Sequence, residues 1–123
     1  MNPRRLARLI FPGFRFGQSD PGAALRLAEL GVGGFCFYGG SAPEVRALSL
    51  ELKAASRTPL LVASDYENGA GQWVSGATAL PSNMALGASG AAALARRKGE
   101  ITALLGDTAI IVFPDCYTAF GGN

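Results

Sequence analysis

Residues 32–64, VGGFCFYGGSAPEVRALSLELKAASRTPLLVAS, decide the fold class because two apolar runs flank one helical pattern. Residues 32–38 are apolar without alternation and rich in aromatic side chains, as expected of a strand covered on both faces. Ser41 and Glu44 stand three apart as a capping box, and apolar residues recur behind them at helical spacing. Residues 60–64 predict a second buried strand, so the order is that of a parallel βαβ unit.

The flanking segments extend this alternation. Upstream, Asp20 and Pro21 form a good helix start and Gly31 a natural stop, while residues 6–11 predict a short helix or turn with apolar residues that cover another element. Downstream, residues 73–89 predict a long irregular loop.

A helix over residues 91–105 and a third buried strand over 109–113 complete the predicted order. Right-handed crossovers place the carboxyl ends of all three strands on one edge of the sheet. Gly39-Gly40, the loop after Ser64 and Pro114-Asp115 therefore share the edge at which open α/β sheets and barrels keep their sites.

Composition bounds the class of protein. A chain of 123 residues with 49% hydrophobic residues predicts one globular domain over residues 1–123. A net charge of +2 from scattered charges predicts neither a nucleic-acid nor a membrane partner. The N-terminal apolar run is too short for a signal peptide, so we expect a cytoplasmic protein.

Metal and cofactor sites are not expected. Cys36 and Cys116 lie in or beside apolar segments, and the chain has no histidine to complete a zinc site with them. We expect both thiols to be reduced and buried. The lack of histidine also excludes Ser/His/Asp and Cys/His catalysis, so any chemistry would depend on carboxylates.

The candidate chemistry lies in residues 64–72, SDYENGAGQ. Asp65 comes one residue after a buried strand, where a carboxylate can accept hydrogen bonds from ligand hydroxyls, although Asp65 and Asn68 could equally cap the turn. Glu67 would point the same way in an extended segment and suggests a glycosidase pair, but it more simply holds the loop. Gly69 and Gly71 lack the spacing of a phosphate-binding motif.

Three further features have functional and structural alternatives. Trp73 could stack on a sugar face or fill the core, and the core is favoured. Arg15 could pair with a loop carboxylate, although exposure is the default for an arginine. The run Arg96-Arg97-Lys98 is expected to form the solvated face of its helix.

Five segments resemble the start of the catalytic domain of glycoside hydrolase family 3: LARLIFPGFRF, LGVGGFCFYGG, PLLVASDYENGAGQ, ALPSNMALGAS and GEITA. The resemblance covers about residues 6 to 103 and is closer to β-glucosidases than to β-N-acetylglucosaminidases. It implies a (β/α)8 TIM barrel, of which this chain supplies about the first three parallel β/α units. It also implies that Asp65 binds sugar hydroxyls and that Glu67, Gly69 and Gly71 support the loop.

The implied activity is retaining hydrolysis of terminal β-glycosides. The nucleophile and acid/base of the family lie beyond the equivalent of residue 123, so we assign no catalytic residue and expect the chain alone to be inactive. The implied partners are a carbohydrate and either the C-terminal part of the barrel or a second copy. A noncatalytic carbohydrate- or protein-binding module is the main alternative, and a small phosphate-binding domain is a weaker one.

Overall fold

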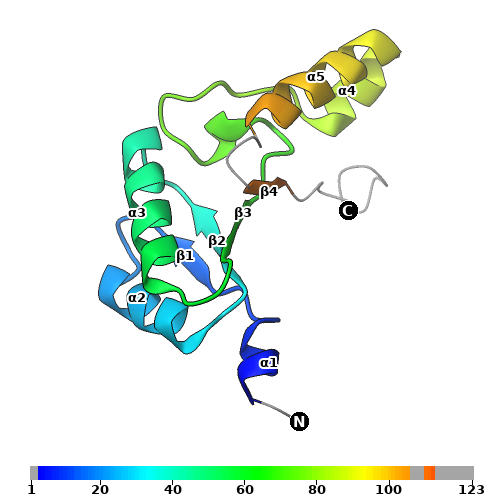
Figure 1. Cartoon of the computed structure of the whole chain (residues 1–123). Helices are drawn as coiled ribbons and strands as arrows, with labels where there is room; N and C mark the ends of the chain where they lie inside the picture. Colours follow the sequence, from blue (N-terminus) through cyan, green and yellow to red (C-terminus); the bar gives the residue numbers. More distant parts are fainter. Residues whose placement is uncertain (1–2, 106–109, 113–123) are drawn as a thin grey trace.

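Parallel strands form one sheet in the order of the sequence (Figure 1). The computed structural model describes residues 3–105 and 110–112, and within these the sheet has four strands: β1 (Gly13–Arg15), β2 (Gly34–Tyr38), β3 (Leu61–Ser64) and β4 (Ile110–Val112). Each neighbouring pair is parallel. The mixed α/β class and the parallel sheet predicted from the sequence are therefore confirmed.

The helices begin and end largely where their caps predict. In α2 the Asp20 carboxylate accepts hydrogen bonds from the first turn, and Gly31 ends the helix with a φ of 90°. Before α3, the main-chain N–H and the hydroxyl of Ser41 both donate to Glu44 Oε2. The helical segments are α1 (Pro3–Ala7), α2 (Pro21–Leu30), α3 (Ala42–Ala55), α4 (Asn83–Ser89), α5 (Ala92–Leu105) and the 3₁₀ turn η1 (Ala70–Gln72).

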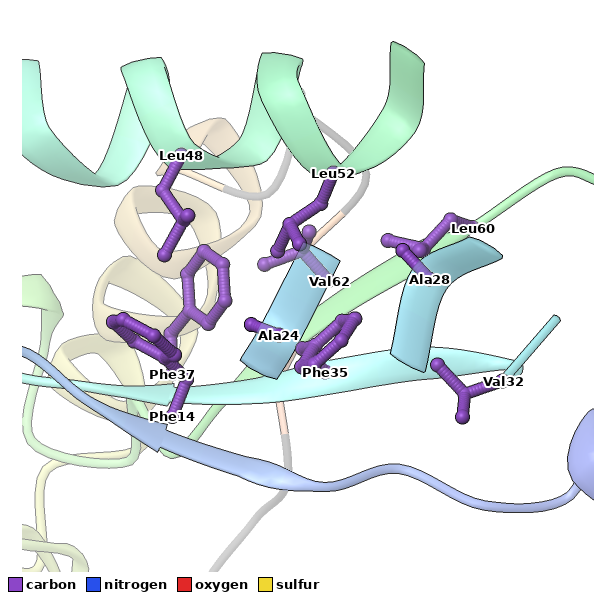
Figure 2. Close-up of a cluster of buried hydrophobic side chains, with 10 residues drawn as sticks. All are labelled: Phe14, Ala24, Ala28, Val32, Phe35, Phe37, Leu48, Leu52, Leu60 and Val62. Carbon is purple, nitrogen blue, oxygen red and sulfur yellow. The ribbon is translucent and has the colours of Figure 1, made fainter. Parts of the chain in front are cut away.

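The hydrophobic core lies between one face of the sheet and the pair α2 and α3. Figure 2 shows Leu48 and Leu52 pointing from α3 toward the sheet, where aromatic side chains of β1 and β2 meet them. The Phe14 and Phe37 rings lie 5.9 Å apart, centroid to centroid. The cluster comprises Phe14, Ala24, Ala28, Val32, Phe35, Phe37, Leu48, Leu52, Leu60 and Val62.

The opposite face of the sheet is more open than the sequence predicts. Cys36 and Tyr38 of β2 are only half-buried, and Gly13, Arg15 and Leu61 on the neighbouring strands are exposed. The prediction that residues 32–38 are covered on both faces is therefore wrong for Cys36 and Tyr38, whereas Val32 and Gly34 are buried. An apolar run without alternation does not show which of its faces is covered, and here the large Phe35 and Phe37 side chains take the helix side.

The segment before β1 covers the start of β2. A Cβ on Gly34 would lie 2.4 Å from the Phe11 ring and 2.3 Å from the Leu61 carbonyl oxygen, so only glycine allows this approach. Residues 6–11 form the end of α1 and a turn, as predicted, but the prediction that their apolar side chains cover another element holds only for Phe11, because Leu6, Leu9 and Ile10 are exposed. The strand that follows them, β1, was missed because its three residues directly follow Pro12.

Residues 73–89 are not irregular throughout. Ser82 caps α4 by accepting a hydrogen bond from the Ala85 N–H, and this short helix lies beside α5, away from the sheet (Figure 1). The sequence concealed α4 because none of its residues is buried, so it has no apolar periodicity. Among the described residues, no helix is both long and apolar enough to cross a membrane. Pro114, Asp115 and Cys116 lie outside the described residues.

Candidate functional site

Three polar side chains, those of Arg15, Tyr38 and Asp65, form a row across the carboxyl ends of β1, β2 and β3. Arg15 pairs with Tyr38 in the register of β1 and β2. In the register of β2 and β3, Cys36 pairs with Ala63, so two residues further along both segments Tyr38 lies beside Asp65 on the same face of the sheet. The negative charge of Asp65 and the positive charge of Arg15 both act on the Tyr38 phenol, as this proximity requires. The row lies on the face opposite α2 and α3.

Trp73 joins this row from the loop that follows β3. Its ring lies 5.0 Å from the Tyr38 ring in a T-shaped contact, and the Arg15 guanidinium lies 5.2 Å from the Tyr38 centroid and 5.4 Å from that of Trp73. These distances are within the range of cation–π attraction. Trp73 is half-buried, packs beside Tyr66 and Val74, and so belongs both to a small core and to the site. We refer to Arg15, Tyr38, Asp65 and Trp73 as the strand-end cluster.

The Tyr38 phenol is held in its neutral form. Its hydrogen bond with Cys36, 3.2 Å from Sγ to Oη, together with burial and the negative charge of Asp65, raises the pKa of Tyr38 to about 12, and the positive charge of Arg15 opposes this only in part. A tyrosine with the ordinary pKa of 10.0 is already protonated at neutral pH, and the raised pKa of Tyr38 extends this range, so its hydroxyl can serve as a hydrogen-bond donor.

Glu67 faces away from this cluster into its own loop. Gln72 Nε2 donates to Glu67 Oε1 over 2.5 Å, and Gln72 Oε1 accepts from the Asn68 N–H over 3.1 Å. The chain turns at Glu67 and Asn68, so the extended geometry that would align Glu67 with Asp65 is absent. These contacts agree with a supporting role for Glu67.

Lys98 connects α5 to the same loop. Its ammonium group donates to the Pro81 carbonyl and to Asn83 Oδ1, each over 2.7 Å, and the residue is only 8% exposed. Burial lowers the pKa of Lys98, and the negative charge of Glu67 opposes this shift. The prediction that Arg96-Arg97-Lys98 form a solvated face is wrong for Lys98, because the sequence does not show that the segment around Pro81 folds against α5.

Two glycines allow the loop to cross itself closely. Gly69 has a φ of 81°, and a Cβ there would lie 2.7 Å from the Thr78 carbonyl oxygen. The Gly71 N–H donates to that oxygen over 2.9 Å, and Ser75 N–H donates to the Gly40 carbonyl over 2.8 Å. The loop that carries Trp73 is thereby tied both to itself and to the end of β2.

The structure therefore brings Arg15 and Trp73 to Tyr38 beside Asp65, while Glu67, Gly69 and Gly71 lie in the supporting loop. Sequence reasoning did not single out Tyr38 as a site residue. Period-two alternation of β2 places Tyr38 on the face opposite Phe35 and Phe37, but the sequence does not show that this face is the open one. Within residues 3–105 and 110–112, no group of three or more Cys, Asp or Glu side chains is arranged to hold a metal ion.

Comparison of the sequence with models of protein families gives no match, and comparison with curated proteins gives no significant match.

Replacing Lys98 tests its anchoring role. Lys98→Met leaves the Pro81 carbonyl and Asn83 Oδ1 without their charged donor, so we expect a loss of about 1–3 kcal/mol in the free energy of unfolding. Arg96→Met, two residues away on the exposed side of α5, should change it by no more than about 0.5 kcal/mol. Urea unfolding measures both variants, and equal effects would contradict the anchoring role.

Replacing Gly71 tests the close crossing of the loop. In Gly71→Ala the new Cβ would lie 2.5 Å from the Ala77 carbonyl oxygen and 2.6 Å from the Ala79 nitrogen, so the backbone must move, at a cost of about 1–3 kcal/mol. The matched variant Gly99→Ala, within α5, meets nothing within 4 Å and should stabilise the chain by about 0.5–1 kcal/mol. Thermal unfolding that shows the same sign for both variants would refute this account.

The raised pKa of Tyr38 predicts a specific pH dependence of stability. A folded-state pKa of about 12, above the ordinary value of 10.0, means that the stabilisation is complete below pH 10 and is lost as the pH rises toward 12. Tyr38→Phe should therefore lose less stability than the wild type between pH 9 and pH 11.5. Urea unfolding at both pH values measures the difference, and identical losses in the two proteins would show the prediction to be wrong.

Proposed function

We propose that this chain is the sugar-binding first part of a retaining glycoside hydrolase related to family 3, with Asp65 as the acceptor for sugar hydroxyls. In this proposal, the observed parallel sheet and its helices are the first units of a (β/α)8 barrel. The observation that carries it is the strand-end cluster, because it combines a carboxylate with two aromatic rings at the carboxyl edge of parallel strands.

The chemistry of the cluster suits a sugar. A carboxylate accepts hydrogen bonds from neighbouring hydroxyls more strongly than a neutral group does, and the neutral Tyr38 phenol can add a donor. Aromatic rings carry negative potential on their faces, which attracts the weakly positive C–H groups of a sugar ring. Half-buried Tyr38 and Trp73 supply such rings beside Asp65.

The open face of the sheet supports an incomplete barrel. Within the described residues, α2 and α3 cover one face, as the outer helices of a barrel do, while Cys36 and Tyr38 on the other face remain half-buried. Further β/α units added beside the sheet would enclose that face and bring additional strand ends to the cluster. We therefore name the C-terminal part of a barrel as the partner favoured by the geometry, and a second copy as the alternative.

The position of Glu67 argues that the chain alone does not hydrolyse glycosides. A retaining enzyme holds two carboxyl groups about 5 to 5.5 Å apart across the scissile bond. In the described loop, Glu67 is bound by Gln72 and attracted by Lys98, so it supports the loop instead of joining Asp65 in the reaction. The catalytic carboxylates must come from the added units.

Fluorescence titration tests the proposal, because Trp73 is the single tryptophan of the chain and lies in the cluster. Addition of methyl β-glucoside or methyl β-xyloside should change the fluorescence emission of Trp73, and this change should reach a plateau at high sugar concentration. Asp65→Asn should weaken the affinity about tenfold or more, since a charge-assisted hydrogen bond contributes about 1.5–3 kcal/mol. The matched variant Glu51→Gln, exposed on α3, should bind as the wild type does.

The same protein should release no 4-nitrophenol from 4-nitrophenyl β-glucoside. Absence of any saturable response to these sugars would refute sugar binding, and hydrolysis by the chain alone would refute the assignment of catalysis to added units.

A further inference from the structure

Arg15 is presented to the cluster from a fixed backbone. Its N–H donates to Ser19 Oγ over 2.9 Å, and its carbonyl accepts hydrogen bonds from the N–H groups of Gln18 and Ser19. The next residue, Phe16, donates its N–H to the Tyr38 carbonyl over 3.0 Å. The end of β1 is therefore held against β2, and the Arg15 side chain starts from a defined position.

The Arg15 guanidinium lies against two aromatic rings. Tyr38 and Trp73 both hold the Arg15 guanidinium within 5.4 Å of their ring centroids, while the residue as a whole remains exposed. A guanidinium carries its N–H donors in a planar fork, the geometry that matches a carboxylate in a bidentate pair. The contact with two rings therefore restricts the motion of the guanidinium, which lowers the conformational entropy that the Arg15 side chain loses when an anion binds.

We propose that the sugar bound by the cluster is an acidic one, a uronic acid whose carboxylate pairs with Arg15 while its hydroxyls are bound by Asp65. This inference rests on the proposed function and specifies its substrate class. A monoanionic carboxylate is favoured over a phosphate, because the single guanidinium of the cluster stands beside the negative charge of Asp65. A dianionic phosphate would leave excess negative charge there.

The test compares ligands that differ in one group, using the full chain and the fluorescence of Trp73. Methyl β-glucuronide should bind about tenfold more tightly than methyl β-glucoside at low salt, and the ratio should fall as salt is raised. In Arg15→Gln the ratio should fall to about one. Arg15→Lys, which keeps the charge but lacks the planar fork, should retain only part of the preference. Arg46→Gln, exposed on α3, is the matched control and should keep the wild-type ratio.

The outcomes separate this inference from the proposed function. Equal binding of glucuronide and glucoside, both weakened by Asp65→Asn, would overturn the acidic substrate and leave sugar binding intact. Tighter binding of glucose 6-phosphate than of glucuronide would overturn the carboxylate assignment. Acetate binding as tightly as glucuronide, with no effect of Asp65→Asn, would overturn both proposals, as would the absence of binding by every ligand. Unchanged urea midpoints in the Arg15 variants would establish that they are folded.

Discussion

The register between β1 and β2 is the constraint on which the candidate site depends. Pairing of Arg15 with Tyr38 places Phe14 and Phe37 side by side one residue earlier, on the helix face of the sheet. Burial of these rings against α2 and α3 therefore fixes the opposite orientation of the residues that follow them. A slip of one residue would exchange the two faces and expose the aromatic core, so packing energy and site geometry are set by the same pairing.

The loop after β3 supplies the remaining aromatic ring and is held by polar side-chain contacts as well as by the small core of Tyr66, Ala70 and Val74. Gln72 and Lys98 hold the loop through Glu67, Pro81 and Asn83, and the Gly71 N–H ties it to Thr78. Burying an ammonium group is costly unless it is hydrogen-bonded, and Lys98 has two such acceptors. The residues that hold the loop are therefore different from Trp73, which supplies the aromatic ring. Substitutions of the residues that hold the loop should have other consequences than substitution of Trp73.

Much of the fold follows from local sequence, but the site does so only in part. The sequence predicted α2, α3, β2 and β3, because the determinants of each lie within a few residues. These determinants are the caps at Asp20, Gly31 and Ser41 and the apolar runs of β2 and β3. The contacts of Lys98 with Pro81 and of Arg15 with Trp73 join residues distant in the chain, and no local pattern shows them. Asp65 was identified by its position after a strand, whereas its neighbour Tyr38 required knowledge of which face was open.

The proposed function requires that sugar C–H groups lie against Tyr38 and Trp73 while Asp65 accepts the hydroxyls. Saturation-transfer NMR measures this contact directly, by irradiating the aromatic protons of the protein in the presence of methyl β-glucuronide and methyl β-glucoside. We expect saturation of the sugar ring protons in the wild type that is lost in Asp65→Asn and diminished in Trp73→Leu, with both variants folded. Equal saturation in the wild type and the two variants, or none in the wild type, would contradict it.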